Sequence, residues 1–80
     1  MLKPKDLEKI GHDLFGPTWQ TALASGLEVG TRTMRRWAAE GAPDHIIHDL
    51  RTLCMERASG LLQTALFLDK LDQEDDQAQP

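Results

Sequence analysis

Three arginines lie close together in the segment TRTMRRWAA, residues 31–39. Four polar residues share an arc of about 140° when this segment is drawn as an ideal helix: Thr31, Arg32, Arg35 and Arg36. Met34 and Trp37 fall nearly opposite and form an apolar stripe. Such a helix has one face suited to a hydrophobic core and another suited to an anionic partner, of which double-stranded DNA is the first candidate.

The residues around this segment have the pattern of two helices joined by a tight turn, over residues 20–39. The apolar positions before and just after the turn are Leu23, Ala24, Leu27 and Val29. Gly26 and Gly30 bracket the turn, and Gly30 is suited to the N-cap position of the second helix. A small residue at Ala24 allows the two helices to cross closely.

This pattern resembles the helix-turn-helix of phage repressor and Cro-type transcriptional regulators, over about a quarter of the chain. The small residue, the apolar residues around the turn and the two anchors of the second helix carry the resemblance: Ala24, Leu23, Leu27, Val29, Met34 and Trp37. The family usually has glycine where this chain has Glu28, at a position that tends to be left-handed. Glutamate there costs on the order of 1 kcal/mol. Either Gly26 or Gly30 takes the strained conformation instead, or the protein tolerates the cost.

The resemblance implies that the second helix enters the major groove of DNA. Arg32 and Arg36, at i and i+4, are the strongest candidates for contacts to base edges or phosphates, and the arginine fork matches the acceptors of guanine. Arg35 lies between them, and Thr31 is placed for a phosphate or a thymine methyl group. The family pattern adds two residues close to the DNA phosphates: Thr18 and Gln20. The alternative is a pair of ordinary core helices with a solvated arginine face.

The composition indicates one small domain with an uneven distribution of charge. The chain has 80 residues and a net charge of −4, yet residues 1–68 hold eight basic and eight acidic side chains. Residues 69–80 hold five acids and one lysine. We expect residues 1–71 to form the domain and residues 72–80 to form an acidic, disordered tail. A domain of this size buries only about 60% of its unfolded surface, so self-association would help it.

The chain is predicted to be all-α, as a compact domain of four to five helices. The expected helices span residues 4–15, start at Pro17, span residues 31–40 and start at Pro43. No β-strand alternation or internal repeat is apparent. Gly60 is a point at which the last stretch would divide into two helices or kink.

The segment 61–71 is more apolar than a solvent-facing terminal helix. A body of about sixty residues can bury one stripe of this segment but hardly all of it. We therefore predict that it lies at a homodimer interface formed by Leu61, Leu62, Ala65, Leu66 and Leu68. A two-fold dimer would place two recognition helices in successive major grooves. The alternative is a last helix packed wholly on its own core.

Several other classes of function find little support. The chain has no glycine-rich phosphate loop, no nucleophile elbow and no cysteine pair for zinc, so we expect no enzyme and no cofactor. His45 and His48 lack a third strong ligand, so we expect no metal site. Cys54, the single cysteine, is expected to be a small core residue in a reducing compartment. The chain has no run of about eighteen apolar residues, so we expect no membrane span, and the N-terminus lacks the apolar region of a signal peptide.

These observations lead us to expect a cytoplasmic, nucleoid-associated DNA-binding regulator that is a homodimer. The simplest mechanism is an autorepressor of a phage or mobile-element operon that occludes a short palindromic operator. The alternative is a helical protein-binding module, an antirepressor or inhibitor with no DNA target, which uses the acidic tail against a basic partner. A DNA-architectural protein without sequence preference is a third possibility.

Overall fold

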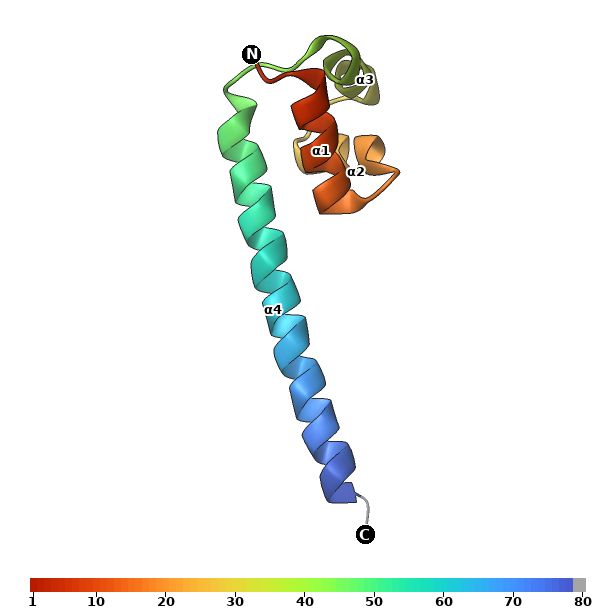
Figure 1. Cartoon of the computed structure of the whole chain (residues 1–80), viewed down its shortest axis with the longest axis vertical. Coiled ribbons are helices and arrows are strands. Elements are labelled where there is room, and N and C mark those ends of the chain that lie inside the picture. The colour runs from red at the N-terminus through yellow and green to blue at the C-terminus, as the bar shows by residue number, and fades with distance from the viewer. Residues whose placement is uncertain (79–80) are drawn as a thin grey trace.

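The computed structural model describes the backbone of residues 1–78 and the side chains of residues 1–73. It contains four helices, which are α1 (Pro4–Phe15), α2 (Trp19–Gly26), α3 (Thr31–Glu40) and α4 (Ile46–Ala78) (Figure 1). These described residues form no strand beyond one isolated antiparallel bridge between Leu2 and Ala42. The prediction of an all-α chain is therefore confirmed, and the number of helices is four.

Proline and glycine set most of the helix ends. Pro4 occupies the first turn of α1, where its fixed φ and its missing N–H cost nothing. Gly41 ends α3 with a φ of +104°, and its N–H donates to the carbonyl of Trp37 at 2.8 Å. Two starts differ from prediction by a few residues. Pro17 and Pro43 lie in the turns before α2 and α4 and do not open the helices themselves.

The core lies where α1, α2, α3 and the beginning of α4 meet. Its buried apolar side chains are Leu2, Leu7, Leu14, Trp19, Leu23, Ala24, Met34, Trp37, Ala42, Ile46 and Leu50. No polar or charged side chain is buried among residues 1–73. The indole of Trp19 lies so close to Gly11 that a Cβ on this glycine would overlap the ring. Glycine at this position therefore allows α1 and Trp19 to pack in contact.

The segment before α1 closes one edge of this core. The N–H of Leu2 donates to the carbonyl of Ala42 at 2.8 Å, and the N–H of Ala42 donates back at 2.9 Å. This pair of bonds holds the N-terminal segment against the linker between α3 and α4. Both side chains are buried as a result.

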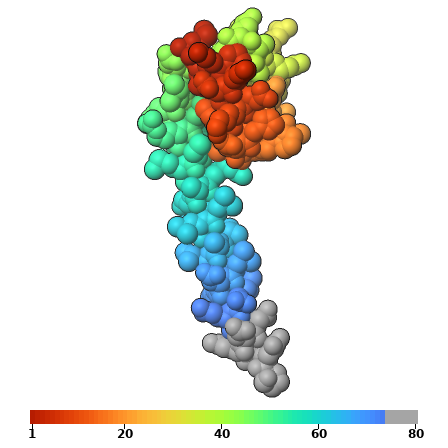
Figure 2. All heavy atoms as spheres, viewed as in Figure 1, coloured from red at the N-terminus to blue at the C-terminus, as the bar shows by residue number. Residues whose placement is uncertain are grey.

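The two halves of α4 differ in what they contact. Ile46 and Leu50 are buried in the core and Leu53 packs against it. Further along α4, the guanidinium carbon of Arg57 lies 4.9 Å from the centroid of the Phe15 ring. We call residues 1–57 the head and residues 58–78 the stem. The stem continues α4 away from the head for about 31 Å, as a projection one helix thick (Figures 1 and 2).

The structure corrects two expectations and excludes one alternative. The chain measures 60 × 21 × 20 Å, so only the head is compact. The last helix does not pack wholly on its own core, because every described stem side chain is exposed. Cys54 is exposed as well, so it is not a core residue. The physical reason is that the head already fills its own core with one side of α4, which leaves the rest of the helix without a surface to cover it.

Gly60 neither divides the last helix nor ends it. α4 runs from Ile46 to Ala78 as one element, and the Thr64 hydroxyl donates to the Gly60 carbonyl at 3.0 Å. α4 also continues past residue 72, so its backbone is helical in the first part of the expected tail. Residues 79–80 lie outside the described residues, and the division of the chain at residue 72 stays a prediction.

Candidate nucleic-acid interface

α3 separates a buried side from an exposed, basic side. Met34 is fully buried and Trp37 is buried, and both belong to the core shared with α1 and α2. The residues of the polar arc are all exposed: Thr31, Arg32, Arg35 and Arg36. The two anchors therefore fix the rotation of the helix about its axis, and that rotation turns the arginines to solvent. The predicted division of α3 into two faces is confirmed.

The turn before α3 has one of the two geometries that the sequence left open. Leu27 is the C-cap residue that follows α2, and the N–H of Val29 donates to the carbonyl of Ala24 at 2.9 Å. Glu28 has a φ of +58°, whereas Gly30 has a φ of −70° and caps α3 in an extended conformation. The chain therefore places a glutamate in the left-handed region and tolerates a cost on the order of 1 kcal/mol. The turn is not reshaped around Gly26 or Gly30.

The charge on the exposed face of α3 is not compensated locally. Within residues 1–73, no ion pair or side-chain hydrogen bond involves Arg32, Arg35 or Arg36. Lys3, Lys5 and Arg51 are likewise without an ion pair or side-chain hydrogen bond among residues 1–73, whereas two cations of the head have partners. Lys9 Nζ donates to Asp13 at 2.7 Å, and this hydrogen bond raises the pKa of Lys9, while Arg57 lies over Phe15. The first turn of α3 also has no acidic residue to offset the positive end of its helix dipole.

The two remaining candidates lie on the preceding helix. Thr18 is exposed and directly precedes α2, and Gln20 is half-buried in its first turn. No hydrogen bond in the described part of the chain links either residue to the arginines of α3. The structure therefore brings four of the six candidates together on one helix and places the other two at the start of α2.

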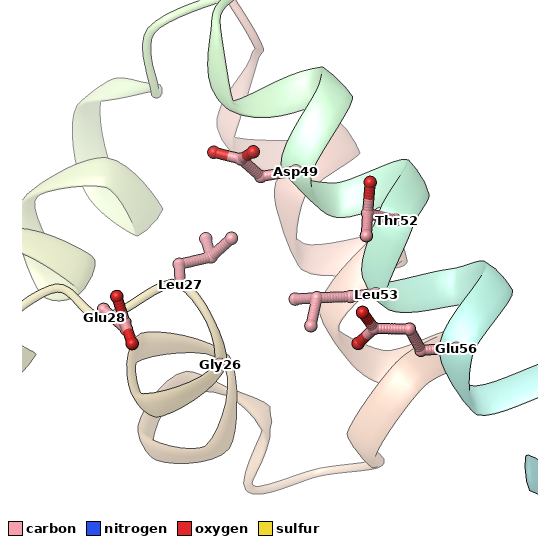
Figure 3. A pocket seen from close by; sticks show the side chains of 7 residues that line it. All are labelled: Gly26, Leu27, Glu28, Asp49, Thr52, Leu53 and Glu56. Carbon is pink, nitrogen blue, oxygen red and sulfur yellow. The ribbon is translucent and has the colours of Figure 1, made fainter.

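A second surface feature, an acidic pocket, was not predicted from the sequence. It has a volume of about 270 Å³ and lies between the α2–α3 turn and α4 (Figure 3). Its lining is Gly26, Leu27, Glu28, Asp49, Thr52, Leu53 and Glu56. The spacing of residues 49, 52, 53 and 56 indicates one face of a helix, but nothing in the sequence pairs that face with Glu28. Three carboxylates make this pocket unsuited to a phosphate, so it does not extend the basic face of α3.

Two further features are absent from the part of the chain that the structure describes. Among residues 1–73, whose side chains are described, no three histidine, cysteine, aspartate or glutamate side chains are grouped so that they could hold a metal ion. No helix among residues 1–78 combines the length and the apolar character needed to cross a bilayer. Comparison of the chain with models of known protein families, with curated proteins and with solved structures found no match.

Proposed function

We propose that this chain is a sequence-specific DNA-binding transcriptional regulator in which α2, the turn and α3 act as a helix-turn-helix. The observation that carries the proposal is the exposed face of α3, on which three arginines have no ion-pair partner among the described residues. A rigid helix with unpaired guanidinium groups matches the width and the charge of a major groove.

The residues of this face have different roles in the proposal. Arg32 and Arg36 contact base edges, since a bidentate pair with guanine discriminates against other bases by about 1–3 kcal/mol. Arg35 and Thr31 contact base edges or the phosphate backbone. Thr18 and Gln20 at the start of α2 fix the docking of the head through phosphates. Phosphate contacts orient the protein, whereas base contacts supply specificity.

The distribution of charge supports such an approach despite the net charge of −4. The head carries eight basic and eight acidic side chains, and the acidic excess lies in residues 69–80. The local field at α3 therefore attracts phosphate, while the acidic end lies at the other end of α4. A pair of chains joined through the apolar stem would occupy a palindromic operator and repress by occluding a promoter, in the manner of an autorepressor of a phage or mobile-element operon.

Selection from a random duplex library at physiological salt tests this function. We expect the wild type to enrich a two-fold symmetric motif that the Arg32→Ala/Arg36→Ala variant fails to recover. The matched control is Lys9→Ala/Lys70→Ala, which removes the same charge from α1 and α4 and should recover the same motif. Retention of DNA without any motif would favour an architectural role, and no retention of the wild type would contradict DNA binding.

A second candidate function follows from the exposed apolar stem. A helical protein-binding module, such as an antirepressor or inhibitor, would use α4 and its acidic end to bind a basic protein. Deletion of residues 72–80 would abolish that binding, whereas Arg32→Ala/Arg36→Ala would leave it unchanged. The two candidates therefore respond in opposite ways to changes in α3 and at the end of α4.

A further inference from the structure

Six of the nine exposed large apolar side chains among residues 1–73 lie in the stem. Its large side chains are each 40–64% exposed: Leu61, Leu62, Leu66, Phe67, Leu68 and Leu71. An isolated helix gains little stability from its own hydrogen bonds and is stabilised in proteins by packing of an apolar face. Contiguous apolar patches of this kind mark interaction surfaces. The stem therefore requires a partner to cover it.

One line of residues along α4 has the spacing of a coiled coil. We call this line the seam, and it consists of Cys54, Ala58, Leu61, Ala65, Leu68 and Asp72. The intervals alternate between four and three residues, so the line returns to the same side of the helix every seven residues. All six side chains are exposed. The head therefore leaves this side of α4 free for a second helix.

The order of small and large residues along the seam disfavours a parallel pair. In a parallel, in-register pair each seam residue faces its own copy, so Ala58 meets Ala58 and Ala65 meets Ala65. Those layers would be underpacked beside the leucine layers, and interiors do not tolerate such voids without cost. Asp72 would also meet Asp72, and the two Asp69 side chains would lie at the same level of the pair. A parallel pair therefore combines poor packing with charge repulsion.

An antiparallel pair removes both problems. When two stems cross near residue 63, Leu61 lies opposite the partner's Ala65 and Ala58 lies opposite the partner's Leu68. Every such layer then combines one small and one large side chain. Asp69 and Asp72 of each stem also move away from their own copies and come beside the first half of the partner's α4, where Arg51 and Arg57 balance Asp49 and Glu56. Steric fit and charge thus favour the same orientation.

We infer that the stem binds a second copy of this chain in antiparallel orientation through the seam, with the two heads at opposite ends. Leu62 flanks the seam and shields it. Leu66 and Phe67 lie outside it, so this register departs from the interface predicted from the sequence at Leu66. This inference rests on the self-association in the proposed function and gives it an orientation and a register. It does not depend on DNA binding.

The single cysteine provides a direct test of the orientation. In the antiparallel pair Cys54 lies opposite the partner's Asp72, so the two Cys54 thiols are separated by about 27 Å along the stem. Oxidation of the full-length wild type should therefore give no covalent dimer on a non-reducing gel. The Asp72→Cys variant should give a covalent dimer, because Cys54 then lies opposite a second thiol. The Cys54→Ser/Asp72→Cys variant is the control and should stay uncrosslinked.

Each other outcome overturns a stated part of the inference. A wild-type dimer linked through Cys54 would show a parallel pair and would contradict the orientation while leaving self-association intact. A dimer by sedimentation in which Asp72→Cys fails to crosslink would contradict the register. A wild type that sediments as a monomer up to the highest soluble concentration would contradict self-association itself. Loss of DNA binding with the crosslink retained would contradict only the proposed function.

A matched pair of substitutions tests the position of the seam. Leu61 in the seam and Phe67 outside it are 64% and 58% exposed in the single chain. We expect Leu61→Ser to weaken self-association by about 100-fold, because each pair loses two leucines from its interface. Phe67→Ser should leave the dissociation constant unchanged. Equal effects of the two substitutions in sedimentation equilibrium would show that the contact does not follow the seam.

Discussion

The head and the stem contain similar proportions of apolar residues, but the head buries many of these side chains and the stem exposes them. The head buries Leu7, Leu23 and Met34 completely and leaves no polar side chain buried among residues 1–73. The stem has an equally apolar sequence, yet all of its described side chains are exposed. The difference lies in the number of neighbours. The core of the head lies between α1, α2, α3 and the beginning of α4, whereas the stem extends beyond all of these elements (Figure 2).

This contrast indicates which part of the molecule is complete on its own. The head has a filled core and one basic surface, whose orientation is fixed by the buried side chains of Met34 and Trp37. The stem has hydrogen bonds along its backbone but no tertiary packing, which is where most helix stability in proteins originates. The head thus holds the arginine face of α3 in a fixed orientation, and the stem presents an apolar surface that another chain can cover.

The largest expected effect is that of shortening a buried leucine of the head, compared with an exposed leucine of the stem. Leu23 is fully buried and Leu66 is 59% exposed. Leu23→Ala should lower the free energy of unfolding by about 2–5 kcal/mol, because it removes buried methyl groups and leaves a cavity. Leu66→Ala should change it by less than about 0.5 kcal/mol. Urea denaturation followed by tryptophan fluorescence measures both, since Trp19 and Trp37 lie in the head. Similar losses for the two variants would remove the distinction between the parts.

The next largest effect on the free energy of unfolding should come from a methyl group added at Gly11, where α1 packs closely on Trp19. Gly11→Ala should lower the free energy of unfolding by about 1–3 kcal/mol, because its Cβ overlaps the indole and the ring must move. Gly60→Ala is the control in the stem, where nothing lies within 4 Å of an added Cβ. That variant should stabilise the helix by up to about 1 kcal/mol, because alanine has the higher helix propensity. A stable Gly11→Ala protein would contradict the close packing of α1 on Trp19.

Substitution of Glu28 by glycine in the turn between α2 and α3 should have a smaller effect than the changes in the core, and it should stabilise the protein. Glu28 holds a φ of +58°, which glycine adopts without the Cβ clash. Glu28→Gly should therefore raise the free energy of unfolding by up to about 1 kcal/mol, and Glu28→Val should lower it. Thermal unfolding monitored by circular dichroism separates the two. The left-handed turn would be contradicted if valine were tolerated as well as glycine.

Removal of the stem should have the smallest effect on the head. A chain that ends at Arg57 keeps every buried residue and the contact of Arg57 with Phe15. We expect its free energy of unfolding at low protein concentration to lie within about 1 kcal/mol of the full-length value, while self-association is lost. Loss of the cooperative tryptophan transition in this shortened chain would show that the head depends on the stem.

Local signals in the sequence predicted most of the head. Pro4, Gly30 and Gly41 mark helix ends through backbone geometry that only neighbouring residues influence. The two faces of α3 follow from the helical period of its arginines and its apolar anchors. The position of Glu28 in the left-handed region also follows from the pattern of the turn, although the sequence left open whether the turn would be reshaped.

The features that were not predicted all join distant parts of the chain or depend on what covers a surface. The bridge between Leu2 and Ala42 spans forty residues and has no local signal. The acidic pocket brings Glu28 beside α4 in the same way. Apolar periodicity indicated that the end of α4 is to be buried, but it does not distinguish burial on the same chain from burial on another. For this reason Cys54 was expected in the core and is exposed instead.

The central claim, that the arginine face of α3 binds DNA, is tested most directly by the salt dependence of affinity for a mixed-sequence duplex. We predict that the wild type binds more weakly as salt rises. On a duplex without the preferred motif, Arg32 and Arg36 neutralise phosphates and do not read bases. The Arg32→Ala/Arg36→Ala variant should therefore bind at least about 10-fold more weakly, with a log–log slope shallower by about 2 per chain. The Lys9→Ala/Lys70→Ala control should retain the wild-type slope. Equal affinity and equal slope for the wild type and the α3 variant would contradict the claim.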